Sequence, residues 1–251
     1  MSKNVYLTLG DKGGIGKTFT AKVLRDWFKL LNRTASCFDL DTENGSFYGY
    51  DKDSIKLCDF SDKLGWLDAV YNSSASQIIV DVPGGKVAEL AATLDAGIPA
   101  LQKAVKDAGR ELIAVQPIGV MRDSTLAAQS VLESFGAGGK VVVVKNGFFG
   151  KPEDFVIFDG IELANGERQY GATGELAKQV GAQIVYLPRL ASVTAAILDM
   201  EGVTLFDAGR SQGRLGYRHA LNASSYLSSA IEGAFSGTWL DPRPSAAEVA
   251  L

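Results

Sequence analysis

Short apolar runs alternate with longer stretches of helical spacing along most of the chain. Residues 78–80 and 141–144 are all Ile or Val, which is typical of strands covered on both faces. Elsewhere apolar residues recur every three or four positions, as over 17–31, which predicts amphipathic helices. The alternation predicts an α/β fold, a doubly wound and mainly parallel sheet with helices on both faces. The expected strands are 5–9, 35–40, 77–82, 112–116, 140–145 and 183–187, and the expected helices are 17–31, 61–71, 87–108, 124–135, 174–180, 193–200 and 217–235.

Two segments are less regular. Residues 148–171 are rich in Gly and polar residues and are either a partner-facing insertion or a long surface loop, with 155–158 as a short hairpin arm. The end of the chain, 237–251, holds two prolines and several small residues, so we expect a loosely ordered tail. Residues 1–236 are expected to form one domain.

Composition narrows the class of protein. The 251 residues are 46% hydrophobic and 22% charged, with a net charge of −4, which fits one large soluble domain and gives no overall basicity for nucleic acid. The two cysteines, Cys37 and Cys58, form no C-x-x-C pair, which argues against a metal carrier and for a reducing compartment. There is no signal-peptide core and no apolar run of about 18 residues, so we expect a cytoplasmic protein without a membrane span.

A glycine-rich loop links the first expected strand to the first expected helix and reads Gly-Asp-Lys-Gly-Gly-Ile-Gly-Lys-Thr over 10–18. Its glycines let backbone N–H groups turn around a phosphate, and the helix N-terminus adds a positive dipole end. Lys17 would neutralise the β- and γ-phosphates of ATP, and the Thr18 hydroxyl would bind Mg²⁺. The residues expected to contact the nucleotide here are Gly13, Gly14, Ile15, Gly16, Lys17, Thr18 and Phe19.

The loop departs from the strict P-loop pattern, which would have Gly at Asp11, and it carries a second lysine, Lys12. In this it resembles the deviant Walker A ATPases of the ParA/MinD group, whose signature is Lys-Gly-Gly-x-Gly-Lys-Thr. The resemblance implies that Lys12 reaches across an ATP-sandwich homodimer to the phosphates of the partner. The alternative is that Lys12 is a solvated loop lysine.

Three aspartates follow expected strands. Asp39 and Asp41 end the second strand, where alternation would put both on one side, and Asp81 follows four apolar residues in a Walker B pattern. Resemblance to switch I of the ParA/MinD proteins implies that Asp41 positions the hydrolytic water and that Asp39 acts near the metal; Thr18 and Asp81 complete the expected Mg²⁺ site. The family continues with Pro-Gln-x-Asn, whereas this chain has Thr-Glu-Asn-Gly over 42–45, which could slow hydrolysis. The alternative for Asp39 and Asp41 is strand-end turn chemistry.

The resemblance covers roughly residues 3–208 in element order and also implies adenine contacts. Asn146 matches a base-contacting Asn at a strand end, and Pro188 with Arg189 matches a later Pro-containing segment. Asn146 and Pro188 could instead be simple turn residues. The family has a small hydroxyl residue where Phe19 stands. This suggests a divergent branch, and such branches include plasmid stability and conjugation-associated ATPases.

The nature of the cargo is open. MinD-branch members carry a C-terminal amphipathic membrane helix, which the prolines at 242 and 244 would break. Arg210, Arg214 and Arg218 recur every four residues without an intervening acid, so on one helix they would form a basic stripe able to meet DNA phosphates without sequence preference. The alternative is a solvated basic face.

Three functional hypotheses follow. The first is an ATP-switched dimerising ATPase, slow and stimulated by an activator or adaptor protein, that positions or partitions plasmid DNA or another cytoplasmic cargo. The second is a metabolic ATP-dependent synthetase of related fold, against which Lys12 argues. The third is a nucleotide-dependent scaffold that does not hydrolyse ATP. A hydrolysis assay with and without DNA separates them.

Overall fold

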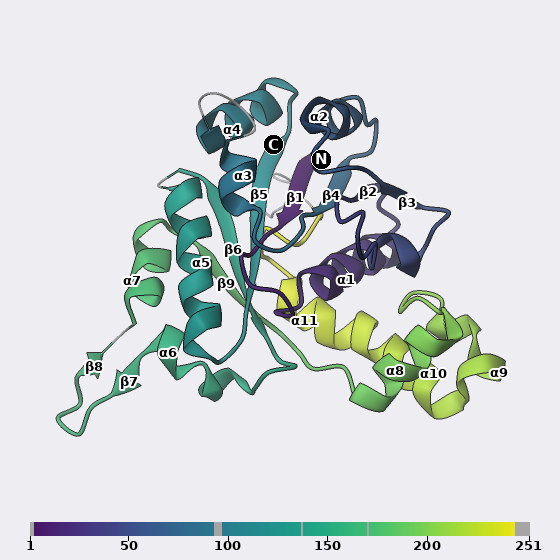
Figure 1. Ribbon diagram of the computed structural model, residues 1–251. Helices are drawn as coiled ribbons and strands as arrows, with labels where there is room; N and C mark the ends of the chain where they lie inside the picture. The colour runs from purple at the N-terminus through teal and green to yellow at the C-terminus, as the bar shows by residue number, and fades with distance from the viewer. Residues whose placement is uncertain (1–2, 93–96, 137, 170, 244–251) are drawn as a thin grey trace.

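A seven-stranded parallel sheet forms the centre of the molecule, with the strand order β3-β2-β4-β1-β5-β6-β9 and helices on both faces (Figure 1). The computed structural model describes residues 3–92, 97–136, 138–169 and 171–243. The strands are β1 (Asn4–Thr8), β2 (Ala35–Asp39), β3 (Ile55–Leu57), β4 (Gln77–Asp81), β5 (Glu111–Ile118), β6 (Lys140–Asn146) and β9 (Gln183–Leu187). The fold class and the six expected strands are confirmed. The edge strand β3 was missed because it has three residues and only Ile55 is buried.

The expected helices are present, except that the single helix expected over 87–108 is two helices, because the first of them ends at Ala91. They are α1 (Lys17–Leu30), α2 (Lys63–Tyr71), α3 (Val87–Ala91), α4 (Gly97–Asp107), α5 (Arg122–Phe135), α7 (Ala172–Gln179), α8 (Ser192–Glu201) and α10 (Tyr217–Ser225), which continues through the π-helical turn η4 (Tyr226–Ile231) into α11 (Glu232–Phe235). The shorter helical pieces are η1 (Tyr48–Tyr50), η2 (Pro152–Asp154), α6 (Val156–Asp159), η3 (Ala208–Arg210) and α9 (Gln212–Leu215). None of the described helices is both long enough and apolar enough to cross a membrane.

Two hydrophobic cores lie on the two faces of the sheet. Alternate residues of each strand point to opposite faces, so Tyr6 joins one core and Leu7 the other. Helix α1 packs on the Tyr6 face because Leu24, Trp27 and Phe28 form one apolar stripe, and all three are fully buried. Burial on both faces explains why the central strands are apolar at nearly every position.

The expected hairpin arm at 155–158 is wrong. Phe155 and Phe158 are both buried in the same core, and side chains three residues apart share a face in a helical turn but point to opposite sides of a strand. The chain accordingly forms the helical turn α6 there. The hairpin follows it, as β7 (Ile161–Glu162) and β8 (Arg168–Gln169), and projects from the body of the molecule (Figure 1).

The C-terminal segment packs on the domain as far as it is described, unlike the loose tail expected from 237 onward. Leu240 is fully buried, the backbone N–H of Trp239 donates to the Gln183 side chain at 2.7 Å, and Arg243 forms an ion pair with Glu232 at 2.8 Å. The rest of the expected tail, 244–251, lies outside the described residues.

Candidate nucleotide-binding site

The glycine-rich loop lies between the carboxyl end of β1 and the start of α1. Gly16 has a φ of 96°, in the region that favours glycine, and a Cβ built there would lie 2.2 Å from Nδ2 of Asn146. Gly10 has a φ of 149°, and its Cβ would lie 2.7 Å from Cδ1 of Ile15. Both positions therefore require glycine, which holds the loop in its curled path. Lys17 and Thr18 then open the helix.

Lys17 points its ammonium into the curl of the loop. Lys17 is 8% exposed, and its Nζ donates to the backbone oxygen of Lys12 at 3.2 Å. Burial lowers the pKa of Lys17, and the carboxylates of Asp81, Asp41 and Asp11 act in the opposite direction. A cation that is buried among loop amides and has one carbonyl acceptor is suited to bind a phosphate.

Asp81 and Thr18 place oxygen atoms next to this lysine. The Thr18 hydroxyl donates to Oδ2 of Asp81 at 2.7 Å, and the Thr8 hydroxyl donates to Oδ1 at 2.5 Å. Burial raises the pKa of Asp81 to about 6; the two hydroxyl donors lower it, Asp39 raises it and Lys17 lowers it. No three His, Cys, Asp or Glu side chains gather into a metal-binding group within the described ranges. The hydroxyl and the single carboxylate suit Mg²⁺, which usually completes its octahedron with water and phosphate.

Asp39 and Asp41 do not act as a pair. The carboxylate of Asp39 is fully buried and accepts three backbone N–H bonds, from Asp41 at 2.9 Å, Phe47 at 2.9 Å and Tyr48 at 2.8 Å. Asp41 lines the cavity and accepts two bonds from Asn44, both at 3.1 Å. The expected alternation fails because β2 ends at Asp39 and the chain then turns. Asp39 therefore holds the loop that follows it. It also lies opposite Asp81 in the pairing of β2 with β4, and its expected role near the metal stays a prediction.

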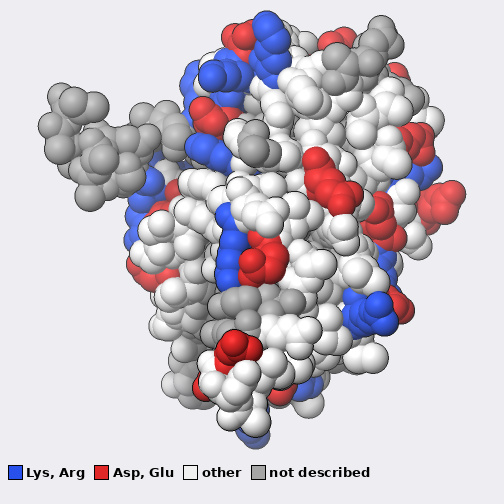
Figure 2. All heavy atoms as spheres, turned by 90° about the vertical axis from the view of Figure 1, so that its left-hand side faces the viewer, with Lys and Arg blue, Asp and Glu red and all other residues white. Residues whose placement is uncertain are grey.

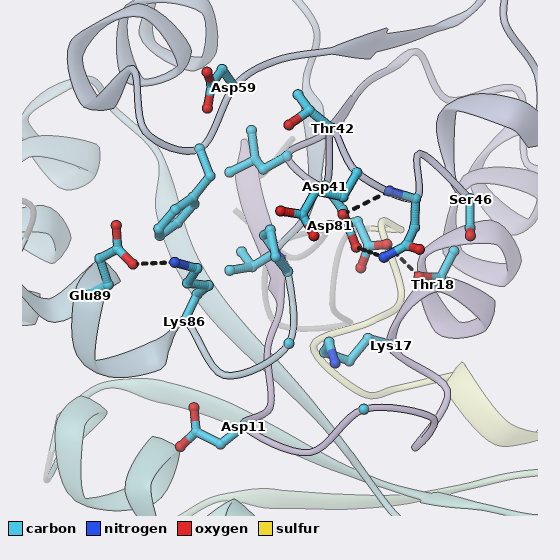
Figure 3. A pocket seen from close by; sticks show the side chains of 18 of the residues that line it. Asp11, Lys17, Thr18, Asp41, Thr42, Ser46, Asp59, Asp81, Lys86 and Glu89 are labelled. Carbon is cyan, nitrogen blue, oxygen red and sulfur yellow. Dashed lines mark hydrogen bonds and ion pairs between the residues drawn. The ribbon is translucent and has the colours of Figure 1, made fainter.

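Lys17, Thr18, Asp41 and Asp81 border a cavity of about 760 Å³ (Figure 3). Its walls come from four segments: the glycine-rich loop, residues 40–46, residues 59–61 and residues 81–89. Sequence reasoning missed the third segment and also missed the ion pair at the mouth, in which Lys86 donates to Glu89 at 2.5 Å. The i,i+3 spacing of that pair was a usable signal.

Asp11, which stands where a strict P-loop has glycine, has a structural role. Its Oδ2 accepts from Ser130 of α5 at 2.6 Å, and its Oδ1 accepts from the backbone N–H of Val87 at 3.3 Å. Asp11 thus links the loop to the start of α3 and to α5.

Lys12, the next residue, does not line the cavity. Its half-exposed side chain forms an ion pair with the exposed Asp123 of α5 at 3.2 Å.

The expected adenine contacts lie outside this cavity. Asn146 is 3% exposed; its Nδ2 donates to the Ile15 carbonyl at 3.0 Å and its Oδ1 accepts from the Phe148 N–H at 3.0 Å. The Pro188 carbonyl accepts a hydrogen bond from the Tyr226 hydroxyl of η4. The Arg189 guanidinium lies 5.5 Å from the Phe148 ring centroid. Asn146 thus braces the loop from behind. Phe19 faces a separate hollow beside α8.

The three arginines do not share a helix, so the expected single stripe is wrong. Arg210 ends η3, Arg214 lies in α9 and Arg218 lies in α10. Gly216, with φ 74° and ψ 146°, breaks the helical path between the last two. Arg214 also forms an ion pair with Glu201 at 3.4 Å. The face on the left of Figure 1 lies away from α9 and α10; its described Lys and Arg side chains are interspersed with Asp and Glu and form no broad basic patch (Figure 2).

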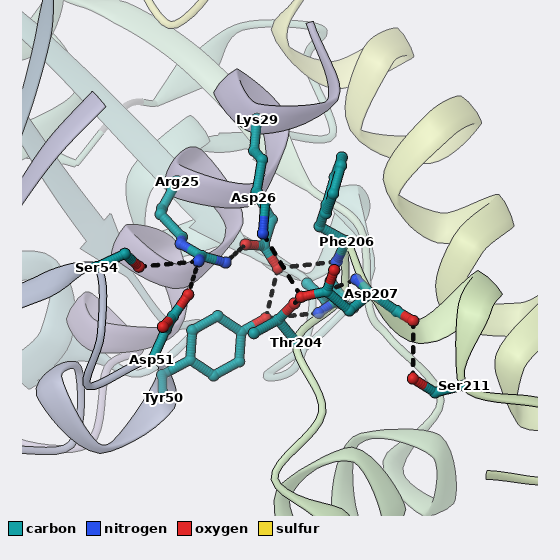
Figure 4. Close-up of polar contacts among 11 residues, drawn as sticks. Arg25, Asp26, Lys29, Tyr50, Asp51, Ser54, Thr204, Phe206, Asp207 and Ser211 are labelled. Carbon is teal, nitrogen blue, oxygen red and sulfur yellow. Dashed lines mark hydrogen bonds and ion pairs between the residues drawn. The ribbon is translucent and has the colours of Figure 1, made fainter. Parts of the chain in front are cut away.

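A buried polar network lies behind the site and joins three distant segments (Figure 4). Asp26 of α1 accepts from the Tyr50 hydroxyl at 2.6 Å and from the Phe206 N–H at 3.0 Å. The Tyr50 oxygen accepts in turn from the Leu205 N–H at 2.7 Å. Arg25 bonds to both Asp26 and Asp51. Helix α1, the loop that leads from Asp41 to β3, and the segment that enters the C-terminal helices are therefore held together.

Comparison with known proteins supports the fold. No family model matches the sequence. Protein MobD of Acidithiobacillus ferrooxidans is 24% identical over 212 residues, which cover 80% of this chain and 89% of MobD. The ParA family ATPase of Chlorobium tepidum is 14% identical and aligns over 89% of this chain and 98% of its own, with a TM-score of 0.51. A chain of the MinC:MinD cell division protein complex of Aquifex aeolicus is a comparable structural match, with 14% identity, coverage of 89% of this chain and 95% of that chain, and a TM-score of 0.50. The chain has the P-loop fold of the ParA and MinD ATPases, as its glycine-rich loop predicted.

Proposed function

We propose that this protein is a Mg²⁺-dependent ATPase of the ParA/MinD type, which dimerises around ATP and positions a cargo. The observation that carries the proposal is the junction of the loop with α1, where Lys17 is buried among loop amides and Thr18 meets Asp81 at 2.7 Å. These groups fit the nucleotide and the metal: Lys17 and the loop N–H groups would hold the β- and γ-phosphates, and the oxygens of Thr18 and Asp81 would hold Mg²⁺.

Hydrolysis needs a group that orients water at the γ-phosphate. Asp41 is the candidate because it lines the cavity beside Thr18 and Asp81 (Figure 3). Both of its oxygens accept from Asn44, so the loop that replaces the usual switch I sequence holds this carboxylate. We infer slow hydrolysis that increases when a partner frees Asp41. The same two bonds favour a second candidate function, a nucleotide-dependent scaffold that does not hydrolyse ATP.

Dimerisation and cargo binding rest on exposed charges. Lys12 forms an ion pair with the solvated carboxylate of Asp123. Because such a surface pair is weak, Lys12 can exchange Asp123 for the phosphates of a second copy. Arg210 of η3 and Arg218 of α10 remain candidates for non-specific contact with DNA phosphates. The triple Arg→Ala variant, including Arg214, should lose any mobility shift of mixed-sequence DNA that a non-hydrolysable ATP analogue induces; normal binding would leave these arginines without that role.

The test is phosphate release from MgATP by the wild type, by Asp41→Ala and by Asp107→Ala, with and without DNA. Asp107 is an exposed aspartate of α4, remote from the cavity, and serves as the matched control. We expect Asp41→Ala to bind ATP but to lose hydrolysis at least tenfold and to accumulate as a dimer in light scattering, while Asp107→Ala behaves as the wild type. Unchanged turnover in Asp41→Ala would remove that residue from the mechanism, and no turnover in any condition would favour the scaffold.

A further inference from the structure

A groove separate from the nucleotide cavity runs between α1 and α8. Two adjoining hollows, of about 320 Å³ and 300 Å³, are both lined by Lys22, Tyr50, Leu198 and Asp199, so they form one elongated depression. Its apolar wall comes from Phe19, Leu190, Ala195, Leu198 and Leu205. The opposite wall is the loop 44–50.

Lys22 contributes a positive charge to both hollows of this groove. It is half-buried, and its Nζ lies 5.0 Å from the centroid of the Tyr50 ring. Burial lowers the pKa of Lys22, while the carboxylates of Asp199, Asp81 and Asp39 raise it. Within the described part of the chain, no group accepts a hydrogen bond from this ammonium, and no carboxylate lies within ion-pair distance of it. This half-buried ammonium is therefore available to an incoming anion, which would form a charge-assisted hydrogen bond with it.

The surroundings of Lys22 select the kind of anion. Asp199 lines both hollows. Its carboxylate would repel a phosphate or a polyanion, whereas it can accept an N–H donor from a ligand with one carboxylate. A hydrophobic group beside that carboxylate would pack against the apolar wall. Because the two hollows adjoin each other and are open to solvent, they suit an extended chain better than a compact molecule.

We propose that this groove binds an acidic peptide segment of a partner protein, with one Asp or Glu carboxylate on Lys22 and a neighbouring apolar side chain against Leu198 and Leu205. Asn44 and Ser46 line both the groove and the nucleotide cavity. A bound segment would therefore touch one side of the loop whose other side faces the nucleotide. The proposal does not depend on ATP hydrolysis.

The experiment is an NMR titration of the ¹⁵N-labelled full chain without nucleotide. The probes are acetyl-Leu-Glu-Leu-amide, its Gln counterpart and propionate. We expect the Glu peptide to shift the amide signals of the groove residues and to bind about tenfold or more tightly than the Gln peptide, since a hydrogen bond to a charged group is worth roughly 1.5–3 kcal/mol. This preference should vanish in Lys22→Met and survive in Lys22→Arg. It should also survive in the control Lys103→Met, which changes an exposed lysine of α4.

Equal binding of the two peptides to the wild type would overturn the proposal, and this comparison holds even if Lys22→Met does not fold. A preference that persists in a folded Lys22→Met would overturn it as well. If propionate alone binds Lys22 as tightly as the Glu peptide does, the groove is a site for a small acid and the peptide assignment is wrong. ATP binding, measured separately on each variant, shows whether the nucleotide site is intact.

Discussion

Removal of one hydroxyl tests whether the network behind the site holds three segments together. In Tyr50→Phe, Asp26 loses the donor that lies 2.6 Å from its Oδ2, and the Leu205 N–H loses its acceptor at 2.7 Å. A hydrogen bond to a charged group contributes roughly 1.5–3 kcal/mol, and an unpaired buried donor costs roughly 1–3 kcal/mol. Asp26 keeps its bonds from Arg25 and from the Phe206 N–H. We therefore expect a net loss of roughly 2–4 kcal/mol in the free energy of unfolding.

Urea unfolding followed by circular dichroism gives this free energy by linear extrapolation. The matched control is Tyr71→Phe, because Tyr71 is 62% exposed on α2. Its free energy of unfolding should change by no more than about 0.5 kcal/mol. If Tyr50→Phe also stays within that limit at an unchanged denaturant slope, the network does not stabilise the fold and our reasoning about it is wrong.

Two further predictions concern single side chains. Asn146→Ala should weaken MgATP binding in calorimetry by about tenfold, because the Ile15 carbonyl loses its donor at 3.0 Å and the loop its brace; wild-type affinity would show that the loop keeps its shape unaided. In a thiol-reagent assay at pH 8, the native protein should react at Cys58 and not at Cys37, since burial raises the pKa of Cys37 to about 12 and leaves almost no thiolate. Burial also raises the pKa of the half-buried Cys58, so its reaction should be slow, and Cys58→Ser should abolish it. Rapid labelling of two thiols in the folded protein would contradict this.

The sequence predicted the features that depend on neighbouring residues. The loop over 10–18 and Asp81 at the end of an apolar strand are local patterns, and both occupy the expected places. The expected one-sided placement of Asp39 and Asp41 failed at the end of β2. The expected single stripe of the three arginines failed at Gly216, where the helical path breaks. The Asp26–Phe206 bond joins residues 180 positions apart, and the groove at Lys22 is likewise lined by residues from α1 and α8, which are far apart in the sequence. No periodicity along the chain encodes such contacts.

The central claim is that the loop before α1 binds the phosphates of ATP through Lys17, and calorimetry with MgATP tests it most directly. Lys17→Ala removes the buried cation, and Lys103→Ala removes an exposed lysine of α4 as the control. Each charge-assisted contact to phosphate is worth roughly 1.5–3 kcal/mol, so the loss of several should leave no measurable heat of binding. We expect the wild type and Lys103→Ala to bind MgATP with equal affinity and folded Lys17→Ala not to bind it. Binding of MgATP by Lys17→Ala with the affinity of the wild type would contradict the assignment of this loop.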